Sequence, residues 1–402
     1  MKIKFWGARG SIATPEPENM HYGGNTSCVE IRTAAGEVLI IDAGTGIRKL
    51  GLSLLQDPHF SRSKKGTIFL SHFHWDHIQG FPFFVPAFIP GYHFKFYGQF
   101  KMGGRLEESL RGQMEHAYFP VRLSDMQSTL EFHEILEETV YVGDTIVTSR
   151  YLNHPQGCFG YRIEDQDGIV VYCSDTEHFP NTLDKKVLEL AEGADILIYD
   201  AQYTEEEYLS KVGWGHSTWN EGVKICREAG VKQLILFHHD PTHNDKFIAK
   251  LEKEAQSEFP NTIAASRELE LNLQNKRSLS PPSAVELKTH VYLPGELEER
   301  GDILIIRAPS SLSEFSSASY REKVLEQITP RFNHIVVDLE KLKNLDSAAL
   351  GTLAAFMEKV QKIQAKYYLY RISDFNREIL EISRFTHFLT ILDDLSILQK
   401  TS

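Results

Sequence analysis

The sequence predicts an α/β protein with two domains, and three observations lead to this prediction. The chain has 402 residues, which is more than one hydrophobic core usually serves. Runs of strand-like apolar residues alternate with runs of helical period. A Pro- and Ser-rich segment at residues 274–286 has the composition of a linker. We therefore expect a larger catalytic domain over residues 1–273 and a smaller domain over residues 287–402.

The larger domain begins with strands, and helices appear between its later strands. The expected strands are residues 2–7, 27–33, 38–43, 67–72, 145–153, 168–175, 196–199 and 233–237. The expected helices are residues 186–191, 204–212, 218–229 and 245–258. Strands interleaved with helices indicate layers in which helices cover sheet faces. Functional residues are then expected in loops at the strand ends.

Composition and charge exclude several classes of function. The 55 acidic residues outnumber the 43 basic ones and give a net charge of −12, which argues against stable binding of long nucleic acids. Arg9 precedes any apolar stretch that could form a signal-peptide core. The most apolar region, residues 80–96, is broken by prolines, and we expect it to form a loop wall rather than a membrane span. With only four scattered cysteines, these features predict a cytoplasmic protein without membrane association.

A cluster of metal-binding residue types follows the predicted strand at residues 67–72. The sequence there reads Ser-His-Phe-His-Trp-Asp-His at residues 71–77. His72 and His74 are two residues apart, so at a strand end both imidazoles can reach one ion. Asp76 and His77 follow as the chain turns and can serve a neighbouring ion. A solvated histidine-rich turn is the alternative, but four ligand residues in one short segment favour a metal site.

Other strand ends offer further ligands. His154 follows one predicted strand, Asp175 ends another, and His238 and His239 follow a third. Adjacent residues on a strand face opposite ways, so only one of His238 and His239 can point into a site. His154 precedes a proline, and a strand-end histidine outside any metal site is its alternative interpretation.

The order of these motifs resembles the metallo-β-lactamase superfamily over residues 1–273. This resemblance implies an αββα sandwich that holds two divalent metal ions, with zinc expected first and manganese or iron as alternatives. The implied ligands are His72, His74 and His154 for one ion, Asp76, His77 and His238 for the other, and Asp175 as a bridge between them. His238 is preferred to His239 because Leu-Phe-His at residues 236–238 resembles the Leu-Thr-His of the ribonuclease Z branch.

Further segments resemble phosphodiesterases of this superfamily. Gly-His-Ser-Thr at residues 215–218 and the strand end at Asp200 resemble a histidine segment of ribonuclease Z and its acidic partner. The resemblance implies that His216 donates a hydrogen bond or a proton to the phosphate or the leaving oxygen, and that Asp200 orients its ring. The alternative is that Ser217 caps the following helix and His216 merely precedes it.

The glycine-rich loops at residues 5–11, 23–27 and 42–46 resemble a bacterial branch related to ribonuclease Z and to enzymes acting on cyclic nucleotides. In these loops Arg9 or Asn25 would contact substrate, although packing in tight turns explains the glycines equally well.

The implied function is hydrolysis of a cyclic nucleotide or another small phosphodiester by a hydroxide that two metal ions activate. Asp76 would hold both a metal and the proton of the nucleophile.

Aromatic residues at 81–97 would form either a pocket wall for a nucleobase or an ordinary core. The long flexible arm with which ribonuclease Z binds transfer RNA is not evident in this sequence. Hydrolysis of a lactone or another ester is the alternative chemistry, and a non-catalytic signalling scaffold in a partner-switching pathway is a third interpretation.

The C-terminal region resembles a STAS domain of the anti-sigma factor antagonist type over residues 287–400. Strand-like runs at residues 303–307, 334–339 and 367–372 alternate with helical runs at residues 318–328, 348–363 and 376–385. The resemblance implies that Ser347 is a phosphorylation site at the start of a helix, where a dianion is stabilised. The usual Asp-Ser-Ser-Gly-Leu-Gly is altered here by Ala348 and Ala349, and a plain N-cap is the alternative. We expect a regulatory module for a kinase or an anti-sigma factor, with homodimerisation as a further use.

Overall fold

A computed structural model gives the conformation of most of the chain. It describes residues 1–99, 106–267, 269–274, 297–310, 315, 318–342, 345, 347–374, 376–377, 380 and 390–392. The chain divides into two compact units, Met1–Leu279 and Ser280–Ser402. The linker predicted at residues 274–286 lies outside the described residues except for its first residue. No helix within the described ranges combines the length and the apolar character that crossing a bilayer requires.

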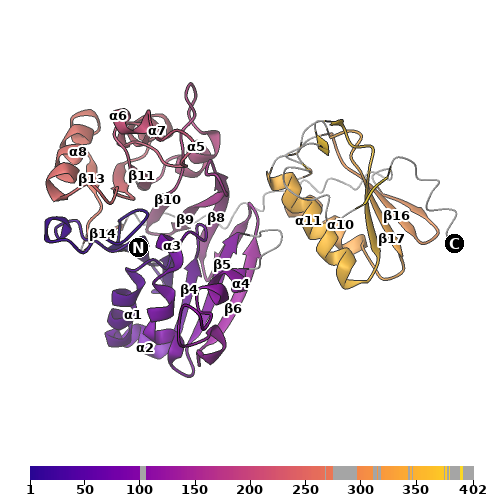
Figure 1. Ribbon diagram of the computed structural model, residues 1–402, viewed down its shortest axis with the longest axis horizontal. Helices are drawn as coiled ribbons and strands as arrows, with labels where there is room; N and C mark the ends of the chain where they lie inside the picture. The colour runs from indigo at the N-terminus through magenta and orange to yellow at the C-terminus, as the bar shows by residue number, and fades with distance from the viewer. Residues whose placement is uncertain are drawn as a thin grey trace. The chain divides into compact units, whose positions relative to one another are not determined.

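Unit one is a sandwich of two seven-stranded sheets (Figure 1). The first sheet contains, in spatial order, β14 (Glu270–Asn272), β1 (Lys2–Gly7), β2 (Cys28–Arg32), β3 (Val38–Ile41), β4 (Lys65–Phe69), β5 (His93–Gln99) and β6 (Thr129–Ile135). The second contains β13 (Thr262–Ala264), β12 (Gln233–Phe237), β11 (Ile196–Asp200), β10 (Gly168–Cys173), β9 (Cys158–Asp165), β8 (Thr145–Leu152) and β7 (Thr139–Val142). Because β1 pairs with β14, the two ends of the unit meet in one sheet.

Helices cover both outer faces, which confirms the predicted αββα layering. The helices that cover the sheets are α1 (Ile47–Gln56) and α2 (Pro58–Ser63) on the first, and α5 (Lys185–Ala191), α7 (Trp219–Ala229) and α8 (Asp245–Glu258) on the second. Further helices of this unit are α3 (Trp75–Ile78), α4 (Leu106–Gly112) and α6 (Glu205–Tyr208). Local sequence sets their ends. Asp184 caps the start of α5, while Gly230, at a φ of 66°, ends α7 in the left-handed conformation that glycine tolerates.

Alternating apolar residues explain why the layers form. In β4, Ile68 packs toward the helices, whereas the neighbouring Phe69 packs between the sheets. Phe237 of β12 and Tyr172 of β10 fill the same central layer from the second sheet. Each fully buried large side chain contributes roughly 1.5–3 kcal/mol through removal of apolar surface from water. The two sheets are therefore held face to face, with their strand ends free to carry polar residues.

The prediction of a loop wall over residues 80–96 is partly wrong. Two 3₁₀ turns, Phe81–Phe83 and Val85–Phe88, precede a regular strand, β5, that starts at His93. Phe81, Phe84, Phe94 and Phe96 are buried in the core under α1 and α2. The structure therefore supports the core interpretation for these four rings, and they form no exposed wall for a nucleobase.

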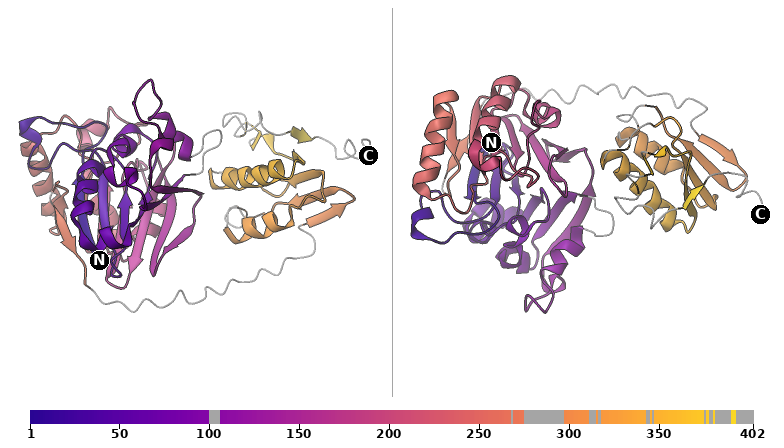
Figure 2. Two further views of the ribbon diagram at one scale, coloured as in Figure 1. Left: turned by 90° about the horizontal axis from the view of Figure 1, so that it is seen from below. Right: turned by 45° about the horizontal axis from the view of Figure 1, so that its top comes forward.

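Unit two has a five-stranded sheet of β15 (Leu297–Arg300), β16 (Ile303–Arg307), β17 (His334–Asp338), β18 (Lys366–Tyr370) and β19 (Thr390–Leu392). Strands β16 to β19 are parallel, and β15 runs antiparallel to β16. Helices α10 (Ala318–Gln327) and α11 (Ser347–Lys362) lie together beside the sheet (Figure 2). Ser347 is thus the first residue of α11. The helix predicted at residues 376–385 lies mostly outside the described residues.

Candidate metal centre

Strand direction brings the predicted ligands to one edge of the sandwich. Strands β10, β11 and β12 are parallel, so their carboxyl ends meet at the same edge of the second sheet. Asp175 and His238 follow two of these ends, and His154 follows β8, which runs in the same direction. Residues 71–77 follow β4 of the first sheet. The ligand atoms form overlapping groups in which all members lie within 4.8 Å of one another.

His72, His74 and His154 form the first group. The His154 Nε2 atom lies 3.4 Å from the His74 Nδ1 atom. The His72 Nε2 atom is buried and has no hydrogen-bond partner within the described structure. Leaving a buried polar atom unsatisfied costs about 1–3 kcal/mol, so this nitrogen is placed to bind something. Burial also lowers the pKa of His72 well below its usual value, which leaves the nitrogen free to act as a ligand.

Asp76, His77 and His238 form the second group. The Asp76 Oδ2 atom lies 3.1 Å from the His238 Nε2 atom and 3.3 Å from the His77 Nε2 atom. Asp175 lies between the two groups. One of its oxygens is 3.2 Å from the His77 Nε2 atom, and the other is 3.7 Å from the His72 Nε2 atom. All seven predicted ligands are therefore brought together.

The donor set fits divalent cations. Two ligands bound tetrahedrally at about 2.1 Å from one ion lie about 3.4 Å apart, close to the separations of 3.1–3.7 Å seen here. The surrounding carboxylates also favour positive charge. Burial alone would lower the pKa of His77, yet Asp175, Asp76 and Asp42 raise it well above its usual value. Imidazole and carboxylate ligands suit zinc, manganese and iron alike, so the clusters can hold metal ions without defining which metal.

His238 and His239 face opposite ways. The His238 ring meets Asp76 and His77, whereas the His239 Nε2 atom lies 2.9 Å from the backbone oxygen of Ala265. A carbonyl oxygen only accepts, so His239 donates this bond and is satisfied away from the cluster. The geometry therefore assigns the inward direction to His238.

The backbone at three strand ends adopts a conformation that side chains rarely tolerate. Asp42, Asp175 and His238 have φ angles of 61°, 57° and 60°. Ser11 is also left-handed, with a φ of 62°, and its backbone N–H donates to the Asp76 carboxylate at 2.7 Å. Such strain persists only where the surrounding structure holds it, and it often marks functional sites.

Oxygen atoms outside the cluster fix the histidine tautomers. The His77 Nδ1 atom lies 2.7 Å from the Asp42 carboxylate, the His154 Nδ1 atom 3.0 Å from the Gly215 carbonyl, and the His238 Nδ1 atom 2.8 Å from the Gln202 side-chain oxygen. Each oxygen accepts a hydrogen bond from the Nδ1–H group, and this tautomer leaves each Nε2 with a lone pair for a metal.

Sequence reasoning missed these supporting residues. Asp42 is fully buried and also accepts from Ser71 and Tyr172, each at 2.8 Å. Glu177 accepts from the backbone N–H groups of Gly213 at 2.7 Å and Gly215 at 2.8 Å. The available signal for Asp42 was its place directly after a buried strand and before the glycines of residues 44–46.

His216 and Asp200 lie together as the resemblance implied. The His216 Nδ1 atom is 2.9 Å from an Asp200 oxygen, and its ring stacks on His238 with centroids 4.9 Å apart. Burial lowers the pKa of His216, but Asp200 outweighs this effect and raises it to about 9. The alternative role of Ser217 is wrong, because Thr218 caps α7. The Ser217 hydroxyl instead lies 2.9 Å from the His178 ring.

The expectation that Arg9 contacts substrate is wrong. Its side chain is fully buried and donates to the backbone oxygens of Gly23, Asp240 and His243 at 2.6–3.1 Å. Asn25, the other residue considered, donates to the backbone oxygen of Trp6 at 3.3 Å. Arg9 therefore ties together the loops beneath the cluster and does not face solvent.

Comparison with known proteins agrees with this geometry. The family model of the beta-lactamase superfamily domain matches residues 38–239, and the STAS domain model matches residues 295–396. Ribonuclease Z of Lactiplantibacillus plantarum is 25% identical over 285 residues, which cover 56% of this chain and 85% of that protein. Ribonuclease Z of Bacillus subtilis is 24% identical over 254 residues, or 51% of this chain and 80% of that protein.

Among solved structures, the metallo-beta-lactamase fold protein YhfI from Bacillus subtilis aligns with a TM-score of 0.51 and 19% identity. The alignment covers 67% of this chain and 98% of YhfI. At that identity the likeness shows a shared fold alone. Together with the family models and the converging strand ends, it leads to one conclusion: the chain belongs to the metallo-β-lactamase superfamily and carries a STAS domain.

Proposed function

We propose that unit one is a metal-dependent phosphodiesterase that hydrolyses a small phosphodiester, with cyclic nucleotides as the expected class. The observation that carries this proposal is the His216–Asp200 pair beside the ligand cluster, because ester hydrolysis by metals alone would leave this pair without a role. The relatives with the name ribonuclease Z are, by that name, enzymes acting on RNA, whose backbone is a phosphodiester. This name supports the same bond type here.

The position of each residue determines its proposed role. His72, His74 and His154 would hold one ion, Asp76, His77 and His238 a second, and Asp175 both. Two divalent ions in such a site supply Lewis acidity toward phosphoryl oxygens and lower the pKa of water. Asp76 keeps its orientation through the Ser11 N–H and would also accept the proton that the attacking water loses.

His216 would act at the leaving group. Its Nδ1 atom is engaged by Asp200, so the Nε2 atom remains for the substrate. From there it would donate a hydrogen bond or a proton to the phosphate or to the leaving oxygen. The Asp200 carboxylate also accepts from the backbone N–H groups of Asp175 and Ser217, at 2.9 Å and 3.2 Å. This network fixes the ring relative to the metal ligands.

Exposed aromatic residues next to the ligands suit a nucleobase. Trp75, inside the histidine motif, is 77% exposed, and Trp214, two residues before His216, is 57% exposed. Aromatic rings of this kind stack on bases. The acidic net charge of −12 opposes a long RNA, so a short substrate with one or two bases is favoured.

The STAS domain would regulate this activity by binding a kinase or an anti-sigma factor. Ser347, the first residue of α11, would be its phosphorylation site. Mass spectrometry of the chain isolated from growing cells tests this role. Phosphate on Ser347 supports it, and its absence under all growth conditions opposes it.

Turnover by the metal-loaded full chain tests the catalytic proposal. We expect hydrolysis of bis(p-nitrophenyl) phosphate and of at least one cyclic nucleotide or dinucleotide, and loss of both in a His72→Ala variant. A chain that hydrolyses only lactones or carboxylic esters would refute the proposal and favour the alternative chemistry. A chain that binds metals but turns over no substrate would instead favour the signalling scaffold.

A further inference from the structure

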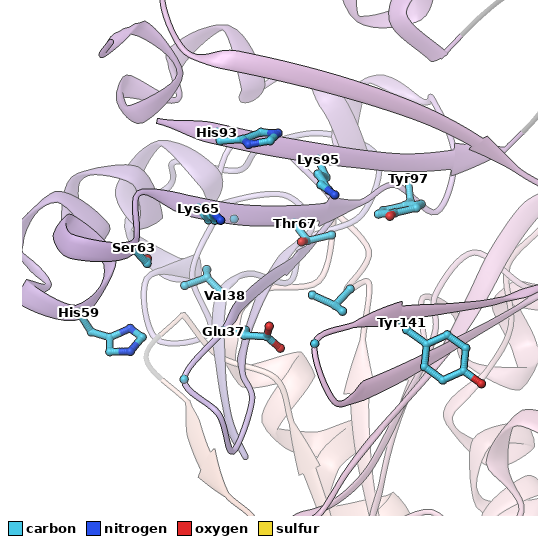
Figure 3. A pocket seen from close by; sticks show the side chains of 14 residues that line it. Glu37, Val38, His59, Ser63, Lys65, Thr67, His93, Lys95, Tyr97 and Tyr141 are labelled. Carbon is cyan, nitrogen blue, oxygen red and sulfur yellow. The ribbon is translucent and has the colours of Figure 1, made fainter. Parts of the chain in front are cut away.

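A cavity opens between the two sheets, at the end of β4 opposite to the metal ligands. It has a volume of about 430 Å³ and is lined by residues of both sheets (Figure 3). Lys65 starts β4, and the metal-ligand segment follows its other end at Phe69. The residues that line the cavity include none of the proposed metal ligands. The cavity is therefore distinct from the metal centre, and its volume is within the range of small-molecule sites.

The inner faces of these strands change from apolar to polar at the cavity. Phe69 and Tyr97 stack with centroids 5.0 Å apart, and they mark where the apolar layer between the sheets ends. Two residues earlier on each strand, Thr67 stands opposite Lys95 in the β4–β5 register. Thr67 is buried, whereas Lys65 and Lys95 are exposed, so the cavity opens to solvent at this end of the sandwich.

Positive charge in the cavity is only partly compensated. Within the described part of the chain, the exposed Lys65 ammonium group has no ion-pair or hydrogen-bond partner. The Lys95 ammonium group lies 3.7 Å from Glu131, which also binds His93 more closely, at 2.7 Å. Figure 3 shows Lys65, Thr67 and Lys95 on adjacent strands around the cavity. Two ammonium groups in such positions suit a dianion better than a monoanion.

A carboxylate on the other side of the cavity lacks a donor. The Glu37 Oε2 atom is buried and has no hydrogen-bond partner within the described structure. Glu37 precedes β3, and its carboxylate lies against Gly143 in the β7–β8 turn of the second sheet, where a side chain on Gly143 would come within 2.3 Å of it. An unsatisfied buried oxygen favours a ligand that brings an N–H or O–H donor.

We propose that this cavity binds a small organic phosphate, whose phosphate group is held by Lys65 and Lys95 and whose hydroxyl or amine groups donate to Glu37. A phosphate monoester carries close to two negative charges near neutral pH, which matches the two lysines. Nucleoside monophosphates and sugar phosphates share this chemistry. Occupation of the cavity does not depend on the metal centre or on the proposed hydrolysis.

Calorimetric titration of the full chain tests this site with adenosine 5′-monophosphate, ribose 5-phosphate and inorganic phosphate. The His72→Ala variant, stripped of metal by a chelator, removes binding at the metal centre. We expect both organic phosphates to bind this protein with Kd below about 1 mM and at least about tenfold more tightly than inorganic phosphate. Equal binding of adenosine monophosphate and ribose phosphate would assign recognition to the shared sugar phosphate, and tighter binding of the nucleotide would add its base.

Separate variants test the two lysines and Glu37. In the same His72→Ala background, a Lys65→Gln/Lys95→Gln double variant should weaken all three probes at least about tenfold. A Lys49→Gln/Lys246→Gln double variant makes the same charge change at exposed lysines elsewhere and should bind as the parent does. Glu37→Ala should bring the affinity of organic phosphates down to that of inorganic phosphate. Absence of binding by the parent, or equal affinities in the Lys65/Lys95 variant and its control, would overturn the proposal.

Discussion

The Nδ1 atom of His77 lies 2.7 Å from a carboxylate oxygen of Asp42, and both side chains are fully buried. Asp42 follows β3 of the first sheet and His77 lies in the short helix after β4, so two neighbouring strand ends are joined. The same carboxylate accepts from Ser71 and Tyr172. Asp42 therefore sets the direction of the His77 ring and presents the opposite nitrogen to Asp76 and Asp175.

Asp42→Asn should weaken metal binding. The amide retains the size of the side chain but lacks the charge that supports a ligating histidine, and we expect a loss of about 10- to 100-fold in metal affinity. Competition with a chromophoric chelator measures this change. Asp144→Asn removes the charge of an exposed aspartate and serves as the control. Equal metal affinities in the two variants would show that Asp42 does not support the site.

Replacing the two adjacent histidines one at a time should affect the metal content differently. His238→Asn removes a nitrogen that lies 3.1 Å from Asp76 and should reduce the metal content of the purified chain. His239→Asn changes a residue bound to the Ala265 carbonyl outside the cluster and should retain the metals, with stability lowered by about 1–3 kcal/mol. Elemental analysis by mass spectrometry gives both metal contents. Loss of metal in His239→Asn alone would reverse the assignment.

A methyl group on Gly10 should displace the His238 ring. A Cβ atom there would lie 2.4 Å from the His238 Nδ1 atom, which is closer than such atoms can approach. We expect Gly10→Ala to lower metal affinity at least about tenfold, as loss of an oriented histidine does. At Gly112, in α4, a Cβ atom meets nothing within 4 Å, so Gly112→Ala should retain the metals and leave stability equal or slightly higher. A Gly10→Ala variant with the parent's metal affinity would show that the ring has room to move.

Glu177→Gln should loosen the loop that carries His216. Glu177 accepts from the backbone N–H groups of Gly213 and Gly215, and the Gly215 carbonyl in turn accepts a hydrogen bond from the His154 Nδ1–H group. An amide has one oxygen instead of two, so at least one of these bonds is lost. We expect kcat for a phosphodiester to fall about tenfold, because misplaced groups lose most of their effect. Exposed Glu206 provides the control in Glu206→Gln, and equal kcat values for both variants would contradict this role.

Local period was sufficient to predict layered α/β packing with functional residues at strand ends, whereas the αββα sandwich and the full ligand set were implied by the resemblance to the metallo-β-lactamase superfamily. His72 and His74 could be recognised from their spacing alone. Asp42, Gln202 and Glu177 could not, since each acts on a partner that is distant in the chain and visible only after folding.

Two errors have a physical cause in the sequence. Three prolines at positions 82, 86 and 90 obscured the alternation of Phe94 and Phe96 in β5. The expectation that Arg9 contacts substrate rested on the resemblance of its glycine-rich loop to those of phosphodiesterases, and that resemblance does not reveal whether the side chain is buried. Here three backbone carbonyls accept from the Nε and Nη1 atoms, while the buried Nη2 atom has no partner among the described residues. No sequence pattern signals that arrangement.

His216 gives the sharpest test of the proposed chemistry. If it protonates the leaving oxygen, its removal should matter most where that oxygen is a poor leaving group. We expect His216→Ala to lower kcat for a cyclic nucleotide about 10²- to 10⁴-fold, and to lower kcat for bis(p-nitrophenyl) phosphate far less, because p-nitrophenolate leaves without a proton.

Metal content, measured in parallel, should stay at the parent level, since His216 is not among the proposed ligands. His178→Ala, whose ring contacts Ser217 in the same loop, controls for disturbance of the loop and should affect both substrates alike. An equal loss for both substrates in His216→Ala would show that His216 only positions the phosphate, because a role in leaving-group protonation must depend on the leaving group.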